Sequence, residues 1–339
     1  MIAGHAERRR LYTSAELQVV APDVAVRARA TALGAPLPIT AIIPTLNEEQ
    51  NLEGSLQSLQ GLVDEVFVID SGSTDATPAI AERYGAHVVQ HPFETHARQW
   101  IWALANLPCR NDWILGLDAD QRVSLELSAE LRQLFSGEQS RLDAVDGFYV
   151  NRRYIFRGRW VKHGGYYPKY LLKLAKRDRM RSHPDDLLDH HFYVDGRVAK
   201  LRHDLIEENK KEEDIAFWTE KHIRYATLLA TEELRRTMTG RLEPLQPLAL
   251  GNPDQRTLWR KGVWRRLRRY GRPFLYFLYR YFVRLGFLDG KEGLIFHFLH
   301  ACWFRLLVDI KLEEQSRNYR RLPKKGNGGE RDNPYHSWV

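Results

Sequence analysis

The stretch Trp113–Asp120 reads WILGLDAD, and it decides the fold class of this 339-residue chain. Its first five residues, Trp113–Leu117, predict a short buried strand that ends directly at an aspartate. Outward from it, apolar strand patterns alternate with amphipathic helical patterns, at 39–44, 47–59, 66–69, 77–84, 87–89 and 95–106 in turn. Alternating strands and helices with short connections predict a doubly wound, mostly parallel α/β sheet. Asn47 is expected to cap the first of these helices.

The overall composition is that of a folded, basic protein. Hydrophobic residues make up 43% of the chain and charged residues 28%, which excludes wholesale disorder and a polytopic membrane protein. The net charge of +8 predicts an anionic partner, such as nucleic acid, nucleotide phosphate or anionic lipid.

Cys109 and Cys302 lie far apart, which excludes a disulfide scaffold and a cysteine zinc site and fits a reducing compartment. No secretory signal is expected, because Arg8–Arg10 are not followed by an apolar run. We therefore expect the chain to stay in the cytosol.

The chain divides into five expected segments. These are an N-terminal extension at 1–37, a catalytic α/β domain at 38–239, a linker at 240–256, basic and aromatic helices at 257–321 and a polar tail at 322–339. Within the catalytic domain, an antiparallel extension of the sheet is predicted from strand patterns at 147–156, 170–175, 192–194 and 198–201. A helix is expected from Glu212 to about Glu233.

Polar clusters follow three of the predicted strands, at Thr45–Glu48, Asp70–Asp75 and Asp118–Asp120. Ligands of such a sheet bind outside the carboxyl ends of its strands, so the three clusters are expected to meet. Carboxylates two residues apart, as at Asp118 and Asp120, can hold one Mg²⁺ or Mn²⁺ against a diphosphate. The alternative for this pair is a solvated turn. For Asp70–Asp75 and Pro44–Glu49 the alternative is helix capping, which fits Asp75 better than Asp70.

Taken in this order and spacing, the three clusters resemble those of the family 2 glycosyltransferases, which have a GT-A fold. The resemblance covers about residues 38–210. It is closest to the bacterial branch with lipopolysaccharide-core and exopolysaccharide sugar transferases, through DSGSTD at 70–75, GLDAD at 116–120, GRWVKHGGYYP at 158–168, Asp195-Gly196 and GFLDGKEG at 286–293. It implies inverting transfer from a nucleotide-diphosphate sugar, with UDP the expected nucleotide and GDP or dTDP left open.

The resemblance also implies site residues. Thr45, Glu48 and Asp70 are expected near the nucleoside, and Asp118 and Asp120 at the diphosphate and the metal. The full set expected at the nucleotide sugar is Pro44, Thr45, Asn47, Glu48, Asp70, Ser71, Gly72, Ser73, Arg98, Asp118 and Ala119.

Inverting transfer requires a general base for the acceptor hydroxyl. The expected base lies in Asp185–His191, with Asp189 first, Asp186 second and Asp185 also open. Further contacts to the metal or the acceptor are expected from His190, His191, His203 and Glu207. For the histidines, the alternative is ordinary packing. Arg152, Arg153, Arg159 and Tyr167 are expected to bind phosphates of the donor or the acceptor. The alternative is a solvated charged face.

The C-terminal region has its own character. Leu258–Leu285 contains nine Arg or Lys and no acid, interleaved with aromatic residues. Arg305 and Asp309 interrupt the apolar stretch that follows, and each would cost about 2.5–3.5 kcal/mol at mid-bilayer, which disfavours a membrane span. A peripheral position on an anionic membrane surface fits better. The alternative is a helical pair packed on the catalytic domain.

Three functions remain open. The leading one is a glycosyltransferase that extends a lipid-linked saccharide or the lipopolysaccharide core at the cytoplasmic face of a bacterial inner membrane. The second keeps this chemistry but takes a polyprenyl phosphate or a protein as acceptor. The third is nucleic-acid binding through Leu258–Leu285, which leaves the acidic strand ends unexplained, so no nucleic-acid partner is expected.

Overall fold

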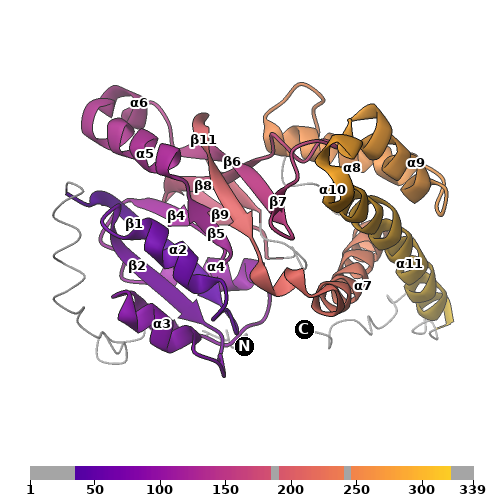
Figure 1. The fold of residues 1–339 in the computed structure, drawn as a ribbon, viewed down its shortest axis with the longest axis horizontal. Coiled ribbons are helices and arrows are strands. Elements are labelled where there is room, and N and C mark those ends of the chain that lie inside the picture. The colour runs from indigo at the N-terminus through magenta and orange to yellow at the C-terminus, as the bar shows by residue number, and fades with distance from the viewer. Residues whose placement is uncertain (1–34, 185–190, 240–245, 322–339) are drawn as a thin grey trace, which may run out of the picture.

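The computed structural model of the chain describes residues 35–184, 191–239 and 246–321. In these parts the chain forms one large mixed sheet with helices on both faces, and a group of helices stands to one side of it (Figure 1). The polar tail at 322–339 and residues 1–34 of the N-terminal extension lie outside the described residues.

The main sheet joins a parallel half to a mixed half. Its strand order is β3-β2-β1-β4-β8-β6-β11-β5, with β7 paired to β6. The strands are β1 (Leu37–Thr45), β2 (Val63–Asp70), β3 (His87–Gln90), β4 (Trp113–Gly116), β5 (Gln121–Val123), β6 (Gly147–Phe156), β7 (Arg159–Trp160), β8 (Tyr170–Lys176) and β11 (Val198–Glu208). The first four in the order pair in parallel, whereas β8 runs antiparallel to both β4 and β6. The predicted α/β class with an antiparallel extension is confirmed.

Two hydrophobic cores lie on the two faces of this sheet. Side chains alternate between the faces along a strand, so Ile39 and Ile43 of β1 enter one core and Ile42 enters the other. The first core is covered by α2 (Leu52–Leu59), α3 (Thr77–Arg83) and α5 (Leu125–Gly137), with the short α6 (Gln139–Asp143) following. The second is covered by α4 (His96–Asn106) and by the hairpin of β9 (Met180–Ser182) and β10 (Phe192–Val194).

The first helix begins later than predicted. It starts at Leu52, and Asn47 does not cap it. Asn47 has a left-handed backbone with φ of 54°. Its side-chain oxygen accepts a hydrogen bond from the Thr74 amide at 2.9 Å, and its own amide donates to Ser73 Oγ at 2.8 Å. The prediction was wrong because this asparagine ties together two strand-end loops, a long-range role that helix spacing does not reveal.

The predicted linker at 240–256 contains the start of a helix. Helix α8 begins at Pro253, and Asn252 caps it reciprocally with Gln255. Residues 240–245 of the linker lie outside the described part. The elements from 210 onward are η2 (Lys210–Glu213), α7 (Ile215–Thr239), α8 (Pro253–Arg266), α9 (Arg272–Leu278), the π-helix η3 (Tyr279–Val283), η4 (Gly286–Asp289), α10 (Gly290–His297), the π-helix η5 (Phe298–Trp303) and α11 (Phe304–Arg321).

Helix α7 packs on α11, and the C-terminal helices thereby join the sheet domain. Ala226 and Ala230 of α7 lie fully buried in two small cores whose other members come largely from α11. At the sheet end, Phe156 of β6, Trp218 of α7 and Phe296 of α10 share a further core. The last helix of the predicted catalytic domain is thus integral to the helical group.

One helical stretch of the described residues, Gly286–Arg321, is long and apolar enough to cross a membrane by length and composition, with a mean hydropathy of 1.4 in its best 18 residues. Of that window, 44% is buried inside the protein. Packed core helices of soluble proteins also pass this test of length and composition. Asp309 on this stretch is fully buried, and its carboxylate accepts two bonds from Arg272 Nε, at 3.0 and 3.1 Å. The sequence-based expectation against a membrane span therefore stands as a prediction.

Candidate active site

The aspartate pair lies where the parallel half of the sheet meets the mixed half. Asp118 and Asp120 occupy the turn between β4 and β5, and the Gln121 amide donates to the Asp118 carbonyl at 2.9 Å to close it. The Glu208 amide of β11 donates to the Asp120 carbonyl at 3.0 Å and so fixes the far side of the turn. Ala119 is buried between the two carboxylates, which are both partly exposed.

Negative charge accumulates around Asp120. Burial raises the pKa of the Asp120 carboxyl well above its usual range, and the nearby carboxylates of Glu207, Asp118 and Glu48 raise it further. The Lys221 ammonium of α7 acts in the opposite direction. The net effect on the Asp120 carboxyl is destabilisation of its charged form, which a cation would relieve.

The oxygen donors present fit a divalent cation that is shared with a substrate. Within 35–184, 191–239 and 246–321, no three His, Cys, Asp or Glu side chains are grouped closely enough to hold a metal by themselves. Mg²⁺ is commonly bound by one or two carboxylates together with substrate phosphates. Asp118 and Asp120 would supply those protein ligands, and such an ion would stabilise the charge on a departing diphosphate.

A buried lysine that no sequence pattern predicted lies against the first aspartate. Lys173 of β8 is only 3% exposed, and its ammonium donates to Asp118 Oδ2 at 3.0 Å. The antiparallel pairing of β8 with β4 brings them together across 55 residues of sequence. No local pattern marks this lysine, because the KYLLKLAK stretch is a plausible strand with or without it.

The predicted Glu207 lies beside this turn, paired with a predicted arginine. Strand β11 runs antiparallel to β5, with Glu207 opposite Gln121. The Arg152 guanidinium donates to both Glu207 oxygens at 2.6 and 2.8 Å. The side-chain amide of Gln121 donates to Glu207 Oε2 at 2.7 Å. Glu207 as a metal ligand and Arg152 as a phosphate contact stay predictions, and each already has a partner of opposite charge.

Arg153 and Tyr167, both expected at phosphates, meet at one buried aspartate. Arg153 Nε donates to Asp204 Oδ2 at 2.6 Å, and the Tyr167 hydroxyl donates to the same carboxylate at 3.2 Å. Asp204 is 3% exposed. This cluster orders the segment after β7 against β11, and it leaves Arg153 a neutralised guanidinium rather than a free cation.

The loops expected at the nucleoside are built around Asp70. Its carboxylate is fully buried and accepts bonds from the backbone amides of Gly72 and Ser73, at 3.1 and 2.9 Å. It also accepts bonds from the Thr45 hydroxyl and from the side-chain amide of Gln90, both at 3.0 Å. Thr45 and Asp70 are register partners of β1 and β2. A nucleobase donor would therefore have to displace one of these groups, and in this arrangement Asp70 shapes the loop.

Glu48 connects the same loops to the segment after β11. Its carboxylate accepts bonds from Lys211 Nζ at 2.5 Å and from the Asn51 amide at 2.7 Å. Glu48 is also one of the charges felt by Asp120. The loop after β1, the aspartate turn and η2 are thus linked through the charges of Glu48, Asp120 and Lys211.

Three other predicted residues lie in different surroundings. Arg98 pairs with Glu94 at 2.6 Å on an exposed face of α4. His203 Nδ1 lies 3.0 Å from Glu130 Oε2 of α5. Arg159 is exposed and lies close to Gly290 at the start of α10. None of these contacts involves the aspartate turn, so the roles expected for these residues find no support in their partners.

The expected general base cannot be placed in this structure. Asp185, Asp186, Asp189 and His190 fall in 185–190, which lies outside the described residues. His191 is described and is half-buried directly before β10. The preference for Asp189 over Asp186 stays a prediction.

Helix α7 contributes functional groups that the sequence analysis did not single out. Lys221 donates to Glu212 at 2.7 Å and lies near Asp120. The Tyr154 hydroxyl of β6 donates to Glu212 Oε2 at 3.0 Å. Helical spacing does not reveal the pair of Glu212 and Lys221, because residues nine apart lie on opposite sides of an α-helix. The pair forms because Glu212 lies in η2, before α7 begins.

Two of the quoted motifs contact each other across more than 100 residues. His163, in GRWVKHGGYYP, donates its backbone amide to Asp289 Oδ2 at 2.9 Å, and its ring Nδ1 lies 2.6 Å from Oδ1. Asp289 belongs to GFLDGKEG and is 3% exposed. This contact anchors the C-terminal helices to the loop after β7.

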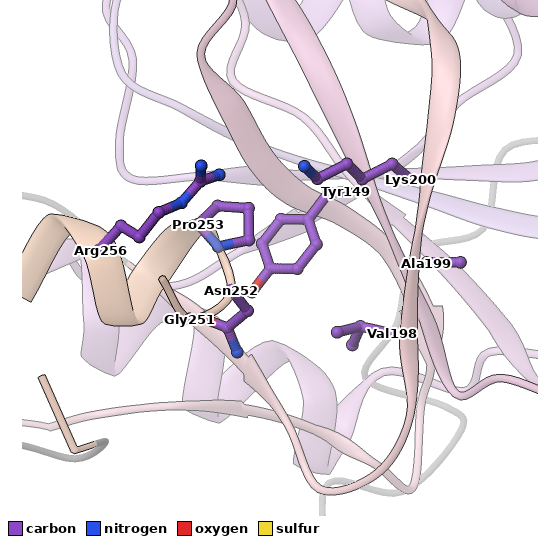
Figure 2. Close-up of a pocket in the computed structure, with 8 residues that line it drawn as sticks. All are labelled: Tyr149, Val198, Ala199, Lys200, Gly251, Asn252, Pro253 and Arg256. Atoms are coloured by element: carbon purple, nitrogen blue, oxygen red, sulfur yellow. The ribbon is translucent and has the colours of Figure 1, made fainter. Parts of the chain in front are cut away.

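A separate cavity of about 210 Å³ lies at the opposite end of β6 and β11. Figure 2 shows the Tyr149 ring pointing from β6 toward Asn252 at the start of α8. The Tyr149 hydroxyl donates to Asp254 at 2.5 Å. Along β11, Lys200 at this cavity and Glu207 at the aspartate turn are seven residues apart, roughly 23 Å at about 3.3 Å per residue, so the cavity is distinct from the aspartate site.

Comparison with known proteins gives the relatives of this chain. Residues 40–194 match the family described as glycosyl transferase family 2. An uncharacterized glycosyltransferase of Rickettsia bellii (strain RML369-C) is 42% identical over 100 residues, which is 30% of this chain and 33% of that protein. The chain thus spans about a third of the length of that relative.

Longer but more distant likenesses also exist. The lipopolysaccharide core biosynthesis glycosyltransferase LpsC of Rhizobium meliloti (strain 1021) is 28% identical over 280 residues, covering 78% of this chain and 91% of LpsC. Among solved structures, glucosyl-3-phosphoglycerate synthase from Mycobacterium tuberculosis in complex with phosphoglyceric acid is 19% identical, with a TM-score of 0.38 over 65% of this chain and 85% of that chain.

The matched segment, 40–194, contains β1 to β4, the aspartate turn, and the loops at Thr45 and Asp70. The match to the family described as glycosyl transferase family 2 thus includes both the aspartate turn and these loops.

Proposed function

We propose that the protein is an inverting glycosyltransferase that moves a sugar from a nucleotide-diphosphate sugar to a lipid-linked saccharide or lipopolysaccharide-core acceptor. The observation that carries this proposal is the acidic turn at Asp118 and Asp120, at the carboxyl ends of the parallel strands of a family 2 domain. The likeness to LpsC along most of both chains supports the acceptor class. UDP is the first nucleotide to test.

In this mechanism the chain's own residues hold the donor and prepare the acceptor. Asp118 and Asp120 would hold a divalent cation, which would supply positive charge against the diphosphate. Lys173 holds Asp118 in place. The base removes the acceptor hydroxyl proton as the acceptor oxygen bonds to the anomeric carbon. The bond from that carbon to the diphosphate oxygen breaks, and the nucleoside diphosphate leaves with the electron pair on the opposite face.

A donor screen tests this function. UDP, GDP or dTDP release from sugar nucleotides is measured with Mg²⁺ or Mn²⁺, with and without lipid-linked saccharide or lipopolysaccharide-core acceptors. The proposal expects release that depends on a divalent cation and rises with one acceptor class, with product mass increased by one sugar. A product carrying the sugar on a polyprenyl phosphate or a protein would favour the second acceptor class instead. No cation-dependent release with any donor would contradict the enzyme.

The general base is tested by paired variants. Asp189→Asn is expected to lower turnover by on the order of 10²–10⁴-fold while donor affinity stays nearly unchanged, because proton removal is lost and donor contacts are kept. Asp186→Asn is the matched control on the same segment. If Asp186→Asn gives the larger loss, the assignment of the base to Asp189 is wrong.

We also propose that the protein works at the cytoplasmic face of the bacterial inner membrane, where lipid-linked saccharides for the lipopolysaccharide core or an exopolysaccharide would be reached. The basic, aromatic composition of residues 257–321 supports a peripheral association. Cell fractionation tests it, with the protein expected in the membrane pellet at low salt and released by high salt.

A further inference from the structure

Large apolar side chains are concentrated on one part of the surface. Twenty-five large hydrophobic side chains are exposed in the described parts of the chain, and fifteen of them lie between Trp259 and Phe298. Scattered exposed leucines are ordinary, whereas a contiguous apolar patch on a folded protein marks a binding surface. These fifteen side chains belong to the segment from α8 to η5.

The helix formed by α9 and η3 carries many of these exposed side chains. It exposes apolar side chains to solvent and buries arginines, the reverse of an ordinary surface helix. Phe274, Leu278 and Phe282, spaced four residues apart on one face, are 52%, 47% and 54% exposed. The arginines of the same helix point inward. Arg272 is 1% exposed and bound to Asp309, and Arg280 is 8% exposed.

Arg280 is held in the interior by the loop after β7. Its Nε donates to the Gly164 carbonyl at 2.6 Å, and its guanidinium lies 3.8 Å from the centre of the Tyr166 ring. The Gly164 amide donates in turn to the Arg284 carbonyl at 2.8 Å. The rotation of this helix is therefore fixed by its polar contacts, and those contacts turn its phenylalanines and leucines outward.

The charges around the surface indicate what covers it. Eight cations between residues 257 and 291 are exposed, and no acidic side chain is exposed in that range: Arg260, Lys261, Arg265, Arg266, Arg268, Arg269, Arg284 and Lys291. A water-facing helix would expose charges of both signs and bury its phenylalanines. An apolar face surrounded by cations alone complements the acyl chains and anionic headgroups of a bilayer leaflet.

We infer that the outer face of α9 and η3, with Phe274, Leu278 and Phe282 at its centre, inserts into the interface of an anionic bilayer. This inference deepens the proposed function and rests on it for its purpose, the capture of a lipid-linked acceptor. The inner face of the same helix binds the loop at Gly164, and Tyr167 of that loop contacts Asp204 beside Arg153. The bilayer would then lie about one helix diameter, roughly 10 Å, from that loop.

Vesicle binding by the full chain tests the inference, without donor or acceptor. Vesicles of phosphatidylcholine alone are compared with vesicles containing 30% phosphatidylglycerol, and partition coefficients are measured by flotation. The triple variant F274S/L278S/F282S is expected to bind the anionic vesicles at least about a hundredfold more weakly, because three apolar anchors are lost. The variant R268Q/R269Q is expected to bind about 30-fold more weakly, with a smaller salt dependence.

A matched control and the contrary outcomes complete the design. L125S/L250S removes two side chains that are 88% and 100% exposed outside this surface, and it should bind like the wild type. All variants should keep the wild-type circular dichroism spectrum, because only exposed side chains change. Equal binding of wild type to both vesicle types, or unchanged binding of the triple variant, would overturn the inference. So would a wild-type dimer that ignores vesicles and becomes monomeric in the triple variant, because the surface would then bind a second copy.

The two proposals can fail separately. Nucleotide release from the donor in vesicle-free solution reports the chemistry, and flotation reports docking. A triple variant that releases nucleotide at the wild-type rate but fails to float supports docking alone. Vesicle binding by a protein with no donor activity would leave docking in place and remove the glycosyl transfer.

Discussion

Asp120 combines a raised pKa with a place among three other carboxylates, so its charge is costly until a cation shares it. Asp120→Asn is expected to lower turnover on the order of 10²–10³-fold, because an amide cannot neutralise a cation at the diphosphate. The same substitution should raise the thermal midpoint of the metal-free protein by a few degrees, since a repelled charge is removed. Initial rates and calorimetry measure the two effects.

The control for this substitution is Asp112→Asn, an exposed aspartate just before β4. It should change neither the rate nor the midpoint. Turnover by Asp120→Asn within about threefold of wild type would remove Asp120 from the site.

Lys173 neutralises Asp118 from the buried side of the sheet. In Lys173→Met the carboxylate loses that partner, so Mn²⁺ should bind about tenfold more tightly. Turnover should nevertheless fall about tenfold, because the lysine no longer holds Asp118 in place beside the diphosphate. Titration calorimetry with Mn²⁺ and steady-state rates measure the two effects separately.

Lys176→Met is the matched control, because Lys176 lies on the same strand and pairs with Asp146 instead. It should leave Mn²⁺ affinity unchanged. Weaker Mn²⁺ binding in Lys173→Met would show that the lysine supports the cation rather than competing with it.

At the scale of elements, α7 and the C-terminal helices bury a group of histidines among aromatic rings. The His222 ring stacks on Trp218 with centroids 3.6 Å apart, and it lies 4.9 Å from His300. Burial lowers the pKa of His222 to about 4, and it lowers the pKa of His300 well below its usual range. Burial between α7 and α10–α11 therefore favours the neutral form of both imidazoles.

This burial makes stability depend on pH. Between about pH 6.5 and pH 4 the unfolded chain binds a proton at His222 and the folded chain does not, so the free energy of unfolding rises with pH in that window. For His222 alone the loss on acidification amounts to about 3 kcal/mol, with His300 acting in the same direction. Thermal midpoints from pH 7 to pH 4.5 should fall, and fall less steeply in His222→Gln. Identical slopes for both proteins would contradict the burial argument.

At the scale of the whole molecule, the helical group is part of the folding unit. Trp218 and Ala226 of α7 are fully buried, and α10, η5 and α11 supply part of their contacts. Removing residues 257–339 would expose these side chains. The truncated chain is therefore expected to aggregate or to lose its near-ultraviolet circular dichroism, so a soluble truncation is a poor test of membrane binding.

This expectation is checked by expressing residues 1–256 and measuring the unfolding transition. A soluble, monomeric fragment with the full-length midpoint would show that the sheet domain folds independently. The surface substitutions on α9 and η3 avoid the problem, because they change half-exposed side chains and keep the buried contacts of Arg272 and Arg280.

Local patterns in the chain predicted the order of strands and helices from β1 to β4 and the positions of the polar strand ends. Both are local: alternating burial and amphipathic spacing are written within ten residues, and a strand's last residue is visible in the chain. The family likeness also followed from these short motifs. The start of the first helix was mispredicted because Asn47 bonds to a loop 27 residues away.

Which charged side chains pair depends on long-range packing. Lys173 reaches Asp118, Arg152 reaches Glu207 and Arg272 reaches Asp309 through strand pairings and helix packing that join distant segments. The outward face of α9 and η3 was decided in the same way, because buried partners for two arginines fix the helix rotation. Such pairings depend on register and on packing between elements, and neither is encoded in any local stretch of the chain.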